Sequence, residues 1–303
     1  MAFDVSAITG YVAVNEKQLI GKTLIKGKTA SLVSKQTGVK GSAYLNLLIA
    51  DSPLVAGGCG WSAGGTTTLS KREIKTGQIK VNQSFCDKTL LGTAYEYGVK
   101  VAVGDKTLPF EEDFINNNIL SIQKQLEDVM WKGDTTAPTY LGRFDGYIKI
   151  LGAAAGVVDV TASAALTSAN AVAEVNKVVA AIKDEIIDST DLVIFAPYEY
   201  ARAYVAGLQA ANLFHYTADY SNGFDFMIPG TNVRMVAVAG LNSTKRMYAG
   251  QLSNFYMGTD LVSNEEKFMF WYSEDNSEYR LKVEFNAGVQ VAFPDQIVRY
   301  IGL

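Results

Sequence analysis

The chain has 303 residues, of which 48% are hydrophobic and 19% charged, and this composition is typical of a folded globular protein. The formal net charge of −4 does not support a general affinity for nucleic acid. Its two cysteines, Cys59 and Cys86, form no metal or redox pattern, and we interpret them as free thiols in a reducing compartment. We expect no secretory signal, and no apolar run approaches the ~18 residues that a membrane span needs.

The first 57 residues are predicted to form an extended N-terminal arm. Glycines and lysines alternate through residues 1–50, which leaves room for at most one short helix, over residues 12–19. A flexible chain terminus is the alternative interpretation.

Residues 58–89 are predicted to form a protruding β-hairpin. Thr68–Lys75 and Gln78–Phe85 are strand-like stretches separated by two residues, and apolar and polar side chains alternate along the second. A lone two-stranded ribbon is marginally stable in water, so this hairpin requires a surface on which to lie. The segment Gly57–Gly65 before it is rich in glycine, but a phosphate cradle is not expected there because no helix N-terminus follows.

A single long helix, which we call the spine helix, is predicted over residues 109–132. Its apolar residues recur at spacings of four and three, which places them on one stripe. Carboxylates fill the first turn, where the helix dipole favours negative charge, and Gly133 after the last turn is suited to a positive φ. The stripe consists of Ile115, Ile119, Ile122, Leu126 and Val129.

The chain after the spine helix alternates between helical and strand-like patterns. Arg143–Ile150 is predicted to be a strand and turn. A helix is predicted along the apolar stripe from Val172 to Ile186, with Thr167 or Ser168 as its cap. The further predicted elements are a buried strand over Asp191–Pro197, a helix over Tyr198–Ala211, a loop at Tyr220–Gly223, and strands over Val233–Ala239 and Met247–Gly250.

The last part of the chain has the clearest strand pattern. Phe268–Tyr272 is followed by an alternating stretch over Leu281–Phe285, a turn at Asn286–Gly288, and a second alternating stretch over Val289–Phe293. We expect this sheet to pack on the spine helix, because the apolar stripe of that helix would otherwise stay exposed to water.

No pattern in the sequence predicts a catalytic, cofactor-binding or metal site. Lys22-Thr23 lacks the earlier glycine of a phosphate-binding loop, and Cys59-Gly60-Trp61 has the wrong order for a thiol protease. His215 is the only histidine, so a zinc site is not expected. We therefore predict a structural protein without a cofactor.

The arrangement of these elements resembles a known family. A long helix ending in Trp131-Lys132-Gly133-Asp134, with a hairpin before it and strands after it, is similar to the major capsid proteins of tailed phages. Their Hong Kong 97-type fold, which encapsulins share, implies the α+β class. The implied organisation is an N-terminal arm (1–57), an extended loop (58–89), a peripheral domain (90–150 and 262–303) with the spine helix (109–132), and an axial α/β domain (151–261).

The resemblance also implies a function. The chain would assemble through pentamers and hexamers into an icosahedral head that encloses double-stranded DNA without reading its sequence. Portal and scaffolding or accessory head proteins would be its partners, and assembly in the host bacterial cytoplasm would yield a virion component. The alternatives are an encapsulin-type compartment around a cargo enzyme, and an α/β enzyme with its site near Tyr216 and Tyr220.

Contacts between subunits are expected at the predicted hairpin. Its basic side chains would be steered by the acidic start of a neighbouring spine helix, and its apolar face would supply adhesion by burial. The basic residues are Lys71, Arg72, Lys75 and Lys80, the apolar ones are Ile79, Val81 and Phe85, and the acidic ones are Glu111, Glu112 and Asp113.

Overall fold

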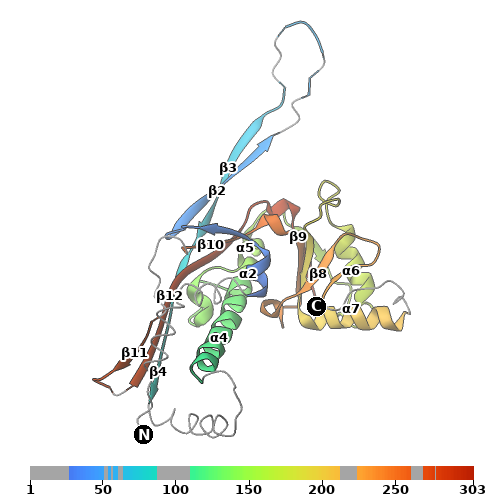
Figure 1. Cartoon of the computed structure of the whole chain (residues 1–303). Coiled ribbons are helices and arrows are strands. Elements are labelled where there is room, and N and C mark those ends of the chain that lie inside the picture. Colours follow the sequence, from blue (N-terminus) through green and yellow to red (C-terminus); the bar gives the residue numbers. More distant parts are fainter. Residues whose placement is uncertain are drawn as a thin grey trace.

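The fold is a mixed α+β arrangement in which one long helix lies between two sheets and a hairpin projects from the body (Figure 1). The computed structural model describes residues 27–50, 54–55, 57–60, 64–86, 110–211, 224–260, 269–276 and 278–303. These residues form a five-stranded sheet, a six-stranded sheet and a two-stranded hairpin. The arm before residue 27, with its predicted helix, lies outside them, as do His215 and the predicted loop at Tyr220–Gly223.

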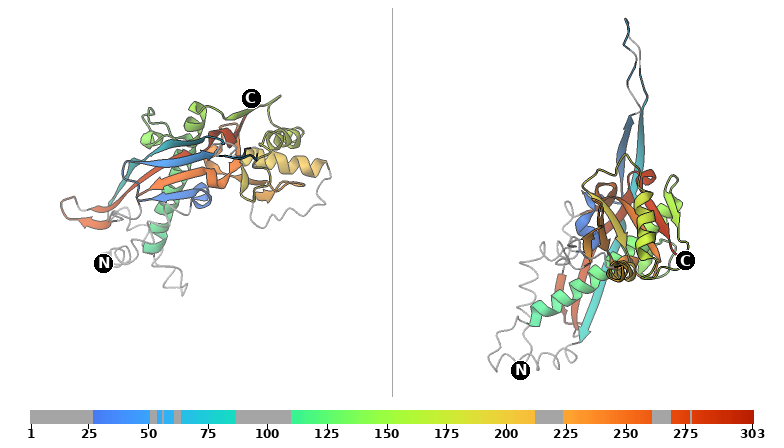
Figure 2. Two further views of the ribbon diagram at one scale, coloured as in Figure 1. Left: turned by 90° about the horizontal axis from the view of Figure 1, so that it is seen from above. Right: turned by 90° about the vertical axis from the view of Figure 1, so that its right-hand side faces the viewer.

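The spine helix is present as α4 (Phe110–Lys132), and its apolar stripe packs where the sequence predicts from Ile119 onward, whereas the side chain of Ile115 lies outside the described atoms. Ile119, Ile122 and Leu126 are buried in one core with β-strand residues from the end of the chain, among them Leu281, Val283 and Val291. Figure 2 shows α4 running along the five-stranded sheet. The helix therefore gains its stability from the sheet that covers its apolar face.

The five-stranded sheet is organised by one long strand, β12 (Glu278–Val291). The predicted turn at Asn286–Gly288 is wrong, because β12 runs straight through it. Gly288 faces Gly258 on the neighbouring strand, and a side chain there would lie 2.2 Å from the Lys75 carbonyl oxygen. This glycine thus permits a close approach of backbones. The other strands are β1 (Ser34–Thr37), β4 (Gly77–Cys86), β10 (Phe255–Thr259) and β11 (Met269–Ser273).

The hairpin joins different strands from those predicted. It consists of β2 (Ser42–Ala50) and β3 (Thr67–Lys75), which pair antiparallel along their whole length. The predicted partner of β3, now β4, instead pairs with β12 over ten residue pairs, from Gly77–Ala287 to Cys86–Glu278. The chain passes directly from β3 to β4 through Thr76, so one extended run serves two different structures.

The six-stranded sheet is buried on both faces. All five side chains of the predicted strand at residues 192–196 are buried: Val193 and Phe195 lie in the core of the spine helix, and Leu192, Ile194 and Ala196 lie in a second core on the opposite face. The terminal strand β13 also belongs here, pairing with β5 and β9, although the sequence assigned the whole region 262–303 to the other sheet. In order across the sheet the strands are β5 (Val158–Thr161), β13 (Val298–Ile301), β9 (Arg246–Gln251), β6 (Leu192–Ala196), β8 (Arg234–Ala237) and β7 (Asp225–Met227).

Two helices pack in this second core, α6 (Ala171–Ala180) and α7 (Tyr198–Ala210). Helix α6 ends before the predicted stripe does, and Asn170 occupies its N-cap position. Helix α7 follows Pro197, as predicted. The remaining short helices are α2 (Lys28–Leu32), α5 (Tyr147–Ala153), η1 (Tyr140–Arg143), η3 (Ala239–Leu241), η4 (Leu252–Asn254) and η5 (Pro294–Gln296).

Helix α5 replaces the strand predicted over residues 143–150. Tyr147 and Leu151, four residues apart, are both fully buried on one face of this helix, while Lys149 forms ion pairs with Asp134 and Asp145 at 2.8 and 2.6 Å. Tyr147, Ile148 and Ile150 are aromatic or β-branched and favour a strand locally, but tertiary packing makes the segment helical. Gly133 does not have a positive φ. Its α-carbon instead lies against the backbone of residues 144–146.

Trp131 joins the two halves of the molecule. It is fully buried at the end of α4, and its ring centroid lies 5.1 Å from that of Phe195 on β6 and 5.7 Å from that of Tyr248 on β9. Gly240 of η3 rests on the indole, since an added Cβ would lie 2.4 Å from Cδ1. Trp131 is therefore the aromatic contact of the spine helix with the central strands of the six-stranded sheet, within a core that α4 and these strands share.

We expect Leu126→Ala to lower the free energy of unfolding by about 2–5 kcal/mol, because it opens a cavity between α4 and β12. Urea denaturation followed by circular dichroism measures this. Leu120→Ala on the same helix is the control, because Leu120 is 60% exposed and its removal leaves no cavity. Equal losses for both variants would contradict the described packing.

Gly240→Ala is expected to destabilise the fold by about 1–3 kcal/mol, because the new methyl group overlaps Trp131 and the backbone of Glu127. The matched control is Gly152→Ala in α5, where the nearest atom to the added Cβ is Arg299 Nη1 at 3.8 Å. Alanine is a better helix former than glycine, so this variant should be stabilised by about 0.5–1 kcal/mol. Thermal melting of both variants measures the two opposite changes in stability. A Gly240→Ala protein as stable as the wild type would contradict the close contact between Gly240 and Trp131.

Candidate functional site

The projecting hairpin is anchored firmly at its base. Leu45 and Ile74 are buried there with Ala292, which follows the end of β12. The Gln290 side-chain amide donates a hydrogen bond to the Glu73 carbonyl at 2.7 Å. These contacts fix the direction in which the two strands leave the body.

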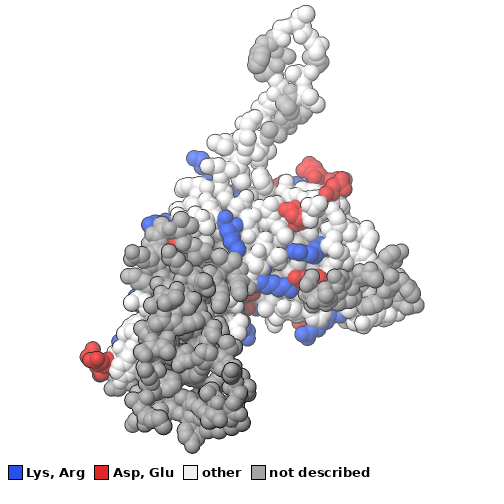
Figure 3. All heavy atoms as spheres, viewed as in Figure 1, with Lys and Arg blue, Asp and Glu red and all other residues white. Residues whose placement is uncertain are grey.

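The outer part of the hairpin exposes apolar side chains to solvent. Leu48 and Leu69 lie opposite each other across the two strands and are 66% and 63% exposed. Tyr44 lies on the same face, and Leu54 near the tip is 89% exposed. Between residues 52 and 70 the sequence contains no aspartate, glutamate, lysine or arginine. The described part of the hairpin is accordingly white along its outer length in Figure 3.

Exposure of these apolar side chains to water is unfavourable, so their burial against another molecule is favourable. Contiguous exposed apolar side chains on a narrow ribbon mark a binding site, since burying them releases about 25 cal/mol per Å² of apolar surface. The ribbon is also marginally stable on its own. We therefore take Tyr44, Leu48, Leu54 and Leu69 as the candidate functional surface.

The basic residues predicted for this region divide between the hairpin and the sheet. Lys71, Arg72 and Lys75 lie on β3, near the hairpin base. Lys75 lies 3.6 Å from Glu73 on the same strand, and partial burial lowers the pKa of the Arg72 guanidinium. Lys80 lies on β4 and forms an ion pair at 3.6 Å with Glu284 of β12.

The apolar residues predicted to bind a neighbour belong to the subunit's own structure. Ile79 and Val81 are partly buried and pack against the core beneath β12. They lie on a paired strand of a sheet and not on a free ribbon, and their contact with another subunit stays a prediction. The backbone of Phe85 pairs with Tyr279, and its side chain lies outside the described atoms.

The acidic residues Glu111, Glu112 and Asp113 occupy the first turn of α4, as predicted. Their side chains lie outside the described atoms. Their contact with a neighbouring hairpin therefore stays a prediction.

The sequence contains a signal for the true hairpin that the strand-by-strand prediction missed. Ser42–Ala50 and Thr67–Lys75 are both nine residues long and flank the glycine-rich segment. A hairpin with a long loop would have explained both the equal lengths and the glycines. Tyr44, Leu48 and Leu69 would then have been identified as its outer side chains.

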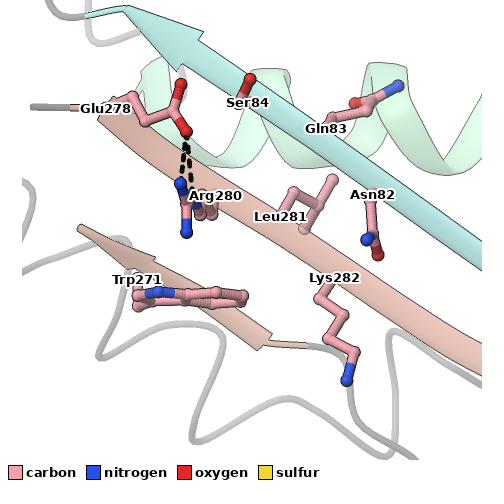
Figure 4. A pocket seen from close by; sticks show the side chains of 8 residues that line it. All are labelled: Asn82, Gln83, Ser84, Trp271, Glu278, Arg280, Leu281 and Lys282. Atoms are coloured by element: carbon pink, nitrogen blue, oxygen red, sulfur yellow. Dashed lines mark hydrogen bonds and ion pairs between the residues drawn. The ribbon is translucent and has the colours of Figure 1, made fainter. Parts of the chain in front are cut away.

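A shallow pocket of about 310 Å³ lies at the other end of the five-stranded sheet (Figure 4). Trp271, Arg280 and Lys282 line it together with polar side chains of β4. Arg280 pairs with Glu278 at 2.8 Å and Lys282 with Glu284 at 3.0 Å, so the cations are neutralised within the sheet. This balance of charge is unsuited to binding a phosphate group.

The described residues offer little else for chemistry. Within the described ranges no group of three or more histidine, cysteine, aspartate or glutamate side chains is arranged to hold a metal ion. None of the described helices combines the length and hydropathy that crossing a membrane requires.

Comparison with family models and with curated proteins gives no match. Solved structures are similar over nearly the whole chain. A chain from the procapsid of satellite phage P4, which includes the size determination (Sid) protein, matches with a TM-score of 0.62 and 13% identity, covering 98% of this chain and 96% of that one.

Two further structures extend this similarity. A chain from the capsid of the empty GTA particle has a TM-score of 0.58 at 11% identity, covering 93% of this chain and 90% of that one. A chain of the virus-like particle from Pyrococcus furiosus has a TM-score of 0.54 at 8% identity, covering 93% of this chain and 96% of that one. At such identities the similarity establishes the fold, and the chain has the fold of phage capsid proteins, as its resemblance predicted.

Proposed function

We propose that the chain is the major capsid protein of a tailed phage and assembles into the icosahedral head that encloses double-stranded DNA. One observation carries the proposal: a hairpin whose outer part is uncharged and exposes apolar side chains projects from a body whose fold matches capsid chains from end to end. A hairpin of this kind has no use in an isolated subunit and needs a second copy of the chain to cover it.

The parts of the body take the roles that a shell requires. The five-stranded sheet with the spine helix serves as the peripheral domain, and the six-stranded sheet with α6 and α7 serves as the axial domain around fivefold and sixfold axes. The extended loop is the β2–β3 hairpin, over residues 42–75. Each contact between subunits is weak, and the closed shell is stable because contacts are numerous.

The remaining partners follow from this role. Portal and scaffolding or accessory head proteins would complete the particle, and assembly would take place in the host bacterial cytoplasm. The net charge of −4 suits a wall that surrounds DNA without binding it. No catalysis is required of the subunit.

The similarity to a virus-like particle keeps the encapsulin-type compartment as the alternative. Electron microscopy of purified particles, combined with nuclease treatment and a DNA stain, separates the two. Closed shells with protected DNA, formed in infected cells, support the head. Closed shells that lack DNA and hold an enzyme support the compartment, whereas a monomer under all assembly conditions contradicts both.

Leu48→Asp is expected to leave the subunit folded and to abolish shells, because it places a charge in the middle of the apolar hairpin surface. Circular dichroism checks the fold and negative-stain microscopy checks assembly. Leu303→Asp is the control, because Leu303 is 59% exposed and lies far from the hairpin in sequence. Normal shells from the Leu48→Asp protein would contradict the hairpin's role.

Lys71→Glu is expected to slow assembly at low salt without changing the final yield. Charges at the rim of an interface steer association more than they stabilise the complex, and their field is screened within about 10 Å at 0.1 M salt. Time-resolved light scattering measures the rate. At 0.5 M salt the variant and the wild type should assemble equally fast; a salt-independent defect would show that Lys71 acts by packing instead.

A further inference from the structure

The segment Gly27–Val33 before the five-stranded sheet contacts both halves of the molecule. It contains the short helix α2 and continues into β1, which pairs parallel with β10. Thr29 and Ala30 on one side of it are fully buried against α4. This segment is part of the predicted N-terminal arm, for which no contact within the subunit is predicted from the sequence.

Its contact with the spine helix is a buried chain of hydrogen bonds. The Trp131 indole N–H donates to Thr29 Oγ1 at 2.8 Å, and that hydroxyl in turn donates to Glu127 Oε1. The Thr29 backbone N–H donates to Glu127 Oε2 at 3.1 Å. Glu127 is only 6% exposed, and a buried carboxylate is tolerated where donors satisfy it.

The segment contacts the six-stranded sheet through Lys28, the residue that precedes Thr29. Lys28 Nζ lies 2.7 Å from Asp225 Oδ1 on β7, and the same ammonium group lies 5.7 Å from the centroid of the Tyr198 ring at the start of α7. Both members of the ion pair are largely shielded from solvent, with side-chain exposures of 31% and 23%. Lys28 and Thr29 are adjacent, so the two contacts are coupled directly through the backbone.

The positions of these contacts define what they do. Trp131 touches the central strands β6 and β9, whereas Asp225 lies on β7, the edge strand two places beyond β6. The other residues of this sheet that pack in the core of the spine helix also lie on β6, β8 and β9 or near η3, and none of them is on β7. A contact at the edge strand acts over a longer lever arm than these central contacts, and so adds resistance to rotation of the sheet.

We propose that residues Gly27–Val33 act as a latch that fixes the angle between the spine helix and the six-stranded sheet. The latch closes through Thr29 on α4 and through Lys28 on β7 and α7. In a shell this angle sets the shape of the subunit and so the curvature of the wall, a consequence that rests on the proposed function. The latch itself lies within a single subunit, so it does not rest on the proposed function.

Hydrogen exchange tests the latch in the unassembled subunit. The backbone amides of Ser31 and Val33 donate to the Gly27 and Thr29 carbonyls within the segment, at 2.8 and 3.1 Å. Lys28→Met, which removes the charge but keeps the stem, should speed exchange at these amides about fivefold. Asp225→Asn should do the same, and the double variant should exchange no faster than either single one.

Lys40→Met is the matched control, because Lys40 is exposed and lies on the same arm beyond β1. It should leave the exchange of Ser31 and Val33 unchanged. The proposal is overturned if Lys28→Met exchanges within about twofold of the wild type, or if the effects of the two single variants multiply in the double one.

Microscopy of assembled Lys28→Met tests the consequence for curvature. We expect a broader distribution of shell diameters than for the wild type and for Lys40→Met. If the distribution of shell diameters is unchanged while hydrogen exchange is faster, the link to curvature is overturned and the latch within the subunit still stands. If the wild type forms no shells at all, the proposed function fails, and the exchange experiment still decides the latch by itself.

Discussion

The burial of Trp131 is the constraint on which the rest of the subunit depends. A tryptophan in a core must find an acceptor for its indole N–H, and here the acceptor is the hydroxyl of Thr29. That requirement draws residues before the first sheet strand onto the spine helix. It also requires Gly240, because any side chain there would overlap the indole. One aromatic ring thus joins the spine helix, the six-stranded sheet and the N-terminal segment.

The second constraint is the division of one extended run between two structures. β3 and β4 follow each other through Thr76, but β3 leaves the body with β2 while β4 stays in the sheet with β12. The run crosses the sheet over Gly288, where the Lys75 carbonyl oxygen would collide with a side chain. Because both sides of the crossing are held, the hairpin leaves the body in a fixed direction. A surface built to reach a neighbour needs that fixed direction as much as it needs apolar side chains.

The errors of the sequence-based prediction share one physical origin. A strand pattern says which side chains share a face, but it does not say which other strand will pair with it. Two adjacent strands with a glycine between them favour a hairpin on local grounds, yet β4 pairs with the longer strand β12, whose Ala287 lies 210 residues after Gly77 at the first pair. Gly288 was interpreted as a turn for the same reason, since a glycine that permits close approach looks identical in sequence to one that bends the chain.

The sequence by itself determined the spine helix, its buried stripe, the buried strand at residues 192–196 and the resemblance to a capsid fold. Each of these depends on periodicity along one segment or on the order of segments, and both are written in the chain. Only the tertiary structure decided the partner of β3, the helical state of α5 and the exposure of Leu48 and Leu69. These depend on which distant surfaces meet, because burial and strand pairing are properties of two segments at once.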